Sequence, residues 1–196
     1  MKDIQNSRIK LLDTFINRIL CVMVGEHFID EEEADIYRFG LECMVLKVIH
    51  YISYIIIAIF MKSVVTMIFS SIILVPLRCM AGGYHAKTRI RCYLFSCAVV
   101  AFLCKLNQVP VSMNISIIIL LIADVIILAF APVENENRPI DMDEKIIFVY
   151  KTRLILLIGN IAIIISVLLK LGIHGYMING ILVVALMLLL GKIKMS

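Results

Sequence analysis

Long apolar runs divide this chain, and they constrain its fold more than any other feature of the sequence. Hydrophobic side chains make up 62% of the 196 residues, and the mean hydropathy is +1.00. A soluble domain, typically about 45–50% apolar, has too little interior to bury so many such side chains, so the surplus must face lipid. The sequence predicts six apolar spans, at approximately 41–60, 63–77, 92–106, 112–131, 154–171 and 173–191.

Basic residues alternate between the segments that join these spans. From the N-terminus onward, successive segments hold 6, 1, 4, 1, 4, 1 and 2 of the 19 Lys and Arg residues. Cytoplasmic segments of membrane proteins carry the excess of positive charge. The series therefore predicts that both termini, residues 78–91 and residues 132–153 face the cytoplasm.

The N-terminal region, residues 1–40, differs in character from the spans. Apolar side chains recur at helical spacing over residues 3–24, with charged and polar side chains opposite them. This pattern predicts an amphipathic helix that lies at the membrane surface or packs on the bundle. We expect an all-α, polytopic membrane protein with about six transmembrane helices, forming one domain over residues 1–196.

Charge and cysteine usage narrow the classes of function. The net charge of +4 is mild and scattered, and no aromatic-basic interleaving typical of nucleic-acid binding is present. None of the six cysteines forms a CxxC pair, so the sequence gives no basis for a zinc or thioredoxin-like site. We expect no metal, no cofactor and no nucleic-acid partner.

The segment 78–92, between the second and third spans, holds the residues suited to catalysis. A cysteine nucleophile reacts as the thiolate, which a nearby base or a positive environment favours. Cys92 lies at the predicted N-terminus of a helix, with Arg89 and Arg91 just before it, and His85 is the histidine of this segment. These residues predict a nucleophile, Cys92, and its general base, His85.

Neighbouring residues admit both functional and structural interpretations. The pair Gly82-Gly83 permits an oxyanion hole of backbone N–H groups, or a simple turn before a helix. Arg78 is suited to clamping a substrate carboxylate or a backbone carbonyl, or serves only as a cytoplasmic charge. Ser96 follows Cys92 by one helical turn and is a candidate third member of the site.

Other polar residues are rivals for these roles. Cys79 is an alternative nucleophile, but it lies near the C-terminal end of a span, where the helix dipole disfavours an anion. Asp124 is the carboxylate in the middle of a span, and such residues are functional candidates because their burial is costly. Pairing with a Lys or Asn on a neighbouring helix is the other interpretation of Asp124.

Helix geometry adds a prediction about the dyad. Seven residues of straight α-helix would separate His85 from Cys92 by about 10.5 Å of rise, too far for a base and its nucleophile. We therefore predict a non-helical break between residues 85 and 91, with Thr88 as N-cap of the helix that contains Cys92.

At these residues the sequence resembles the accessory gene regulator protein B (AgrB) family, membrane endopeptidases of Gram-positive bacteria that process autoinducing-peptide precursors. The family pattern is an Arg, then Gly-Gly-x-His-Ala, then a Cys seven residues after the His. It is matched here by Arg78, the segment 82–86 and Cys92. The later family pairs correspond to Ala131-Pro132 and Arg138-Pro139.

The resemblance implies a reaction and partners. Cys92 would cleave the precursor through an acyl-enzyme thioester, with His85 as base and later acid, and a Cys or Ser of the precursor would then close a thiolactone or lactone ring. The resemblance also implies a homodimer in the cell membrane of a Gram-positive bacterium. Two other classes remain open, a small non-catalytic transporter or peptide exporter and a structural membrane scaffold.

Overall fold

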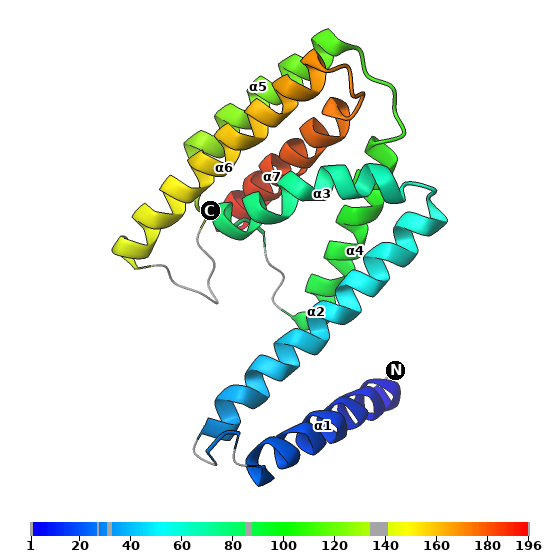
Figure 1. Ribbon diagram of the computed structural model, residues 1–196, viewed down its shortest axis with the longest axis vertical. Helices are drawn as coiled ribbons and strands as arrows, with labels where there is room; N and C mark the ends of the chain where they lie inside the picture. Colours follow the sequence, from blue (N-terminus) through cyan, green and yellow to red (C-terminus); the bar gives the residue numbers. More distant parts are fainter. Residues whose placement is uncertain (1, 27, 31–32, 85–87, 134–140, 196) are drawn as a thin grey trace. The chain divides into compact units, whose positions relative to one another are not determined.

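A computed structural model describes residues 2–26, 28–30, 33–84, 88–133 and 141–195 of the chain. Over these residues the secondary structure is helical, apart from one isolated bridge between Gly82 and Val133. The helices are α1 (Lys2–Gly25), α2 (Ala34–Phe60), α3 (Val64–Ala81), α4 (Arg89–Leu106), α5 (Met113–Phe130), α6 (Met142–Leu168) and α7 (His174–Met195) (Figure 1). The predicted all-α fold class is confirmed.

The chain divides into two compact units, Met1–Ser53 and Tyr54–Ser196. In the first unit, α1 coincides with the predicted amphipathic helix, and its Ile16 and Leu20 form a small apolar cluster with Ile29. The apolar stripe of α1 is thus partly covered within its own unit.

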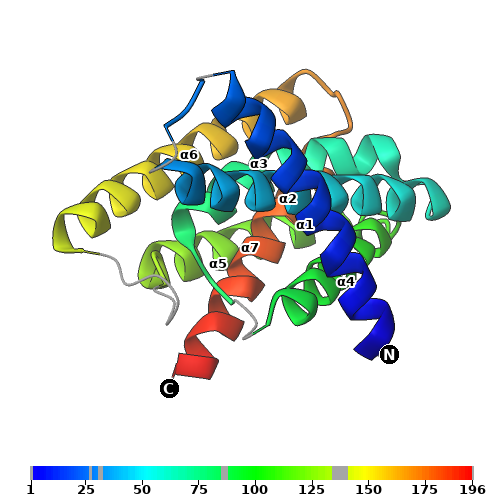
Figure 2. The same cartoon turned by 90° about the horizontal axis from the view of Figure 1, so that it is seen from below.

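The second unit is built around α7, whose side chains are the most buried of the apolar helices. Helix α7 packs against both α3 and α5, and α3 also packs against α6 (Figure 1). The perpendicular view shows α7 with α5 on one side and α4 on the other (Figure 2). Residues of α3, α5, α6 and α7, including Leu77, Ile127 and Leu188, form the main core.

In the part of the chain that the structure describes, five helices are long and apolar enough to cross a membrane, namely α2, α3, α5, α6 and α7. Helix α4, which corresponds to the predicted span 92–106, does not meet this criterion because Arg89, Arg91 and Lys105 lie within its 18 residues. Helix α6 begins at Met142, well before the predicted span 154–171, because the side chain of Asp141 caps it by accepting from the N–H of Met142 at 2.8 Å.

Contacts within the second unit show which of the segments that join its helices lie at the same end of the bundle. Gln108, after α4, donates to the carbonyl of Met61 at 2.6 Å and to the hydroxyl of Ser63 at 3.0 Å, both before α3. At the opposite end, Val133 pairs with Gly82, beyond the ends of α5 and α3. This grouping agrees with the alternation of basic residues, since links at one end carry few of them and links at the other carry many.

Candidate functional site

The candidate site begins where α3 ends. The helix stops at Ala81 because Gly82 and Gly83 adopt φ angles of 73° and 122°, a region that side chains with a Cβ rarely enter. The N–H of Gly82 donates to the carbonyl of Arg78 at 3.3 Å, closing the last turn. The glycine pair is therefore a helix terminus, and the N–H of Gly82 is already used in it.

Gly82 is also a point of close backbone approach. A Cβ built on Gly82 would lie 2.3 Å from the carbonyl oxygen of Val133, and the N–H of Val133 donates to the carbonyl of Ala81 at 3.0 Å. Val133 directly follows Ala131-Pro132, whose peptide bond is cis. The Ala-Pro pair and the Gly-Gly pair, about fifty residues apart in sequence, thus meet in space.

Arg78 fastens the same loop from the side of α3. Its half-buried guanidinium donates from Nη1 to the carbonyl of Gly82 and from Nη2 to the carbonyl of Tyr84, the latter at 2.7 Å. A planar fork of donors suits two acceptors at once. Of the two clamping roles considered for Arg78, the structure contains the one toward backbone carbonyls, and those carbonyls belong to its own chain.

Helices α7 and α4 hold the loop from two further directions. The N–H of Tyr84 donates to the carbonyl of Met187 in α7 at 3.0 Å. The Tyr84 ring lies against Phe95 of α4, with ring centroids 4.6 Å apart and planes inclined by 50°. The loop residues 82–84 are therefore fixed by α3, α4 and α7 together with Val133.

Cys92 lies in the first turns of α4. The N-cap Thr88 has an extended backbone, its Oγ1 accepts from the N–H of Arg91 at 3.3 Å, and its carbonyl accepts from the N–H of Cys92 at 2.9 Å. The predicted N-cap is confirmed, and the predicted helix break lies at Thr88. Cys92 is half-buried.

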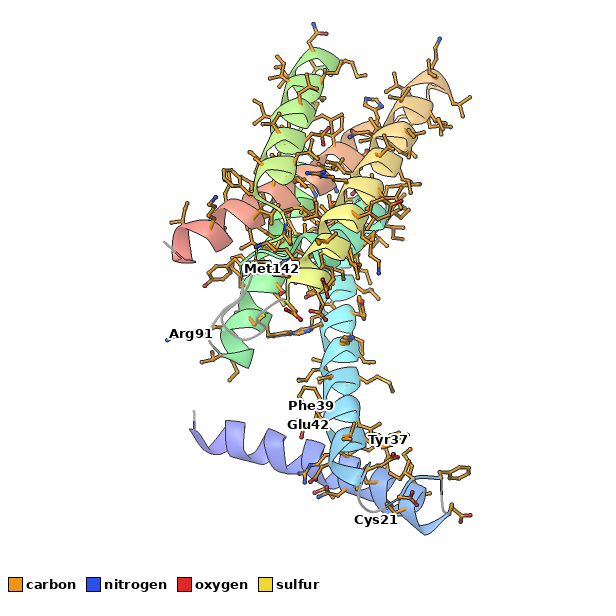
Figure 3. All side chains as sticks on the ribbon, turned by 90° about the vertical axis from the view of Figure 1, so that its left-hand side faces the viewer. Cys21, Tyr37, Phe39, Glu42, Arg91 and Met142 are labelled. Carbon is orange, nitrogen blue, oxygen red and sulfur yellow. The ribbon has the colours of Figure 1, made fainter. Side chains whose placement is uncertain are left out.

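Two parts of the predicted motif lie outside the described residues. His85, with Ala86 and Lys87, is one of them, and the pair Arg138-Pro139 is the other. The structure describes the chain on both sides of the histidine, at Tyr84 and Thr88. Figure 3 shows Arg91, one residue before Cys92, pointing outward from α4.

The remaining candidates are dispersed over the second unit. Ser96 is half-buried on α4, and Cys79 is exposed in the last turn of α3. Asp124 accepts a hydrogen bond from Asn160 of α6 at 2.9 Å, so the predicted pairing with a neighbouring helix is observed. Within the described ranges, no group of three or more His, Cys, Asp or Glu residues could hold a metal ion.

Sequence reasoning missed the contributions of Met187 and Val133, and that of Gly191 in α7, where an added Cβ would lie 2.8 Å from the carbonyl carbon of Gly83. Met187 and Val133 act through their main chains, so no side-chain motif marks them. Gly191 had a weak signal, because Gly180 and Gly191 are eleven residues apart in an apolar helix and thus share a face.

These features define a polytopic helical membrane protein with a cysteine at the capped N-terminus of an internal helix. The chain belongs to the accessory gene regulator B (AgrB) family, which matches residues 16–191. Membership places it in the agr quorum-sensing system and among membrane proteins that process an autoinducer precursor peptide. No match was found among curated proteins or among solved structures.

Proposed function

We propose that this protein is a cysteine endopeptidase that cleaves the autoinducer precursor through an acyl-enzyme thioester and promotes its cyclisation. Cys92 is the nucleophile and His85 the general base. The observation that carries the proposal is the position of Cys92, in the first turns of a helix that the side chain of Thr88 caps. A cysteine nucleophile reacts as the thiolate, and the N-terminus of a helix is an environment that stabilises anions.

The proposed reaction has two steps. His85 takes the proton of the Cys92 thiol, and the sulfur attacks the scissile carbonyl carbon. The C–N bond breaks, the leaving amine takes the proton from His85, and the N-terminal part of the precursor stays on Cys92 as a thioester. His85 then takes the proton of a thiol or hydroxyl of the precursor, and that sulfur or oxygen attacks the thioester carbonyl carbon. The bond to Cys92 breaks, the Cys92 sulfur recovers the proton from His85, and the ring closes as a thiolactone or lactone.

Roles for the residues around the dyad follow from their contacts. Because Arg78 and the N–H of Gly82 are engaged by the chain itself, we assign Arg78 and Gly82 to positioning the loop that leads to His85. Gly83 and Ser96 remain the candidates for contact with the tetrahedral intermediate. A side-chain hydroxyl one turn after the nucleophile is on the same face of α4.

The proposal includes a setting in the membrane. The loop 78–91 and both termini would face the cytoplasm of a Gram-positive cell, where α1 would help to dock an amphipathic precursor. The grouping of basic links at one end of the second unit supports this orientation. We further propose that residues 1–196 act as one peptidase domain and that the enzyme is a homodimer.

Single-residue variants co-expressed with the precursor test the proposal. Cys92→Ala and His85→Ala should each abolish cleavage, measured by mass spectrometry of the precursor fragments, while the protein remains in the membrane. Cys92→Ser should be much slower because a serine hydroxyl is harder to ionise. Cys79→Ala is the matched control and should retain substantial activity.

Two outcomes would contradict the proposal. One is cleavage at the normal rate by Cys92→Ala with loss of cleavage in Cys79→Ala. The other comes from thiol labelling. A cysteine endopeptidase should have one cysteine that reacts far faster with a thiol reagent than the other five. Uniform reactivity, together with unchanged precursor, would favour a non-catalytic transporter.

A further inference from the structure

The last turns of α7 contact the main chain that leads to His85. Gly191 is buried, and a Cβ built on it would lie 2.8 Å from the carbonyl carbon of Gly83 and 2.8 Å from the nitrogen of Tyr84. One turn earlier, the carbonyl of Met187 accepts the hydrogen bond of Tyr84. Helix α7 thus meets the Gly83–Tyr84 peptide at two consecutive turns.

The atoms that a side chain at Gly191 would strike are backbone atoms. Carbon atoms in proteins are in optimal contact at about 3.5–4.0 Å, so a methyl group at Gly191 requires the loop or the helix to move by several tenths of an ångström. Arg78 and Val133 hold the other sides of the loop, so this movement cannot be absorbed by a flexible side chain. Tyr84 would be displaced with the loop, and the chain continues from it to His85.

We propose that Gly191 is a positioning residue for precursor cleavage. Because Gly191 has no side chain, α7 can approach the Gly83–Tyr84 peptide closely, and the Met187 carbonyl fixes the position of Tyr84, the last described residue before His85. This inference rests on the proposed function, in which His85 must reach Cys92. It assigns a role in the reaction to the end of α7, a helix that contains neither member of the dyad.

Helix α7 offers its own internal controls. Gly175, in its first turn, has no atom within 4 Å of a built Cβ. Gly180 packs on α3, where a Cβ would lie 2.5 Å from the Ser70 carbonyl oxygen. The three glycines therefore differ in their surroundings: Gly175 is open, Gly180 packs against another helix, and Gly191 packs against the loop.

The test compares Gly191→Ala with Gly175→Ala in the full-length membrane-embedded protein. Purified variants are assayed with the precursor, and rates are normalised to the Cys92 that a thiol reagent titrates. Gly191→Ala should lower kcat on the order of ten- to hundredfold, as expected for a misplacement approaching 1 Å. KM should change by less than about threefold, because precursor binding is not the step affected. Gly175→Ala should match the wild type in both constants.

Several outcomes would overturn the inference. A wild-type kcat in Gly191→Ala is one, and an equal loss in Gly175→Ala is another, since it would show a general sensitivity of α7. A rise in KM at unchanged kcat would assign Gly191 to binding instead. If Cys92→Ala abolishes cleavage while Gly191→Ala keeps its kcat, the proposed function stands and only the role of Gly191 is removed.

A second variant covers the case in which Gly191→Ala does not accumulate in the membrane. The ammonium of Lys192 lies 4.0 Å from the centroid of the Phe130 ring and holds the same turn of α7 against the last residue of α5. Lys192→Met keeps the stem and removes the charge. It should lower kcat, by no more than about fivefold, because the loss cannot exceed the stability that an exposed cation–π contact gives to this turn. An unchanged kcat in Lys192→Met would then overturn the inference.

Discussion

Arg78 donates a hydrogen bond to the carbonyl oxygen of Tyr84 at 2.7 Å, across the turn that follows α3. The same guanidinium donates to the carbonyl of Gly82. One side chain therefore holds two backbone carbonyls of the loop that precedes His85. A lysine can supply the charge at this position but not the two-pronged geometry.

Arg78→Lys should consequently reduce precursor cleavage on the order of tenfold or more, because one of the two carbonyls loses its donor. The initial rate of cleavage in isolated membranes, normalised to protein amount, measures this effect. Arg91→Lys is the matched control, since Arg91 is exposed and points away from α4 (Figure 3). Equal rates for the two variants would argue that Arg78 contributes charge alone.

Gly82→Ala should be strongly damaging because two effects coincide at this position. The φ angle of 73° is unfavourable for alanine, and the new Cβ would lie 2.3 Å from the Val133 carbonyl oxygen. Gly172→Ala isolates the first effect, since its φ is 71° and no atom lies within 4 Å of a Cβ there. We expect loss of cleavage for Gly82→Ala and near-normal cleavage for Gly172→Ala. Similar activities would show that the approach of Val133 is unimportant.

Asn107 should stabilise the bundle at the end opposite the candidate site. Its amide donates to the Ser70 hydroxyl at 2.9 Å, and its side-chain oxygen accepts from Asn179 at 2.9 Å. Asn107→Ala removes both bonds, and buried polar contacts in membrane proteins contribute roughly 0.6 kcal/mol each. The unfolding midpoint in detergent should fall by a few degrees, roughly 2–5 °C. Asn114→Ala, at an exposed position on α5, should leave it unchanged.

The proposed orientation predicts which links a membrane-impermeant thiol reagent can reach in intact cells. In a chain whose six natural cysteines are replaced, a cysteine at Val111 should be labelled, because the link between α4 and α5 would face outward. A cysteine at Lys87 should be protected until the cells are opened. Labelling at position 87 in intact cells would rule out the orientation in which the loop 78–91 faces the cytoplasm.

Much of this organisation follows from local sequence patterns. The apolar runs located six of the helices, and the spacing of apolar side chains over residues 3–24 located α1. Hydropathy and helical periodicity are properties of neighbouring residues, so they can be read without knowing the tertiary contacts. The N-cap at Thr88 and the resulting helix break were likewise predictable. An N-cap depends only on a side-chain hydroxyl and on a backbone N–H a few residues later, which donates to it.

The tertiary structure alone decided what surrounds the loop after α3. From the sequence, Gly82-Gly83 was equally consistent with an oxyanion hole and a turn, and Arg78 with three roles. The contacts of Gly82 with Val133 and of Tyr84 with Met187 bring together backbone atoms from segments that are distant in sequence, and backbone atoms carry no residue-specific signature. The sequence by itself thus determined the helices and the chemically capable residues. Packing of α7 and the link after α5 determined which backbone groups hold the loop beside Cys92, because close approach depends on three-dimensional distance and not on residue order.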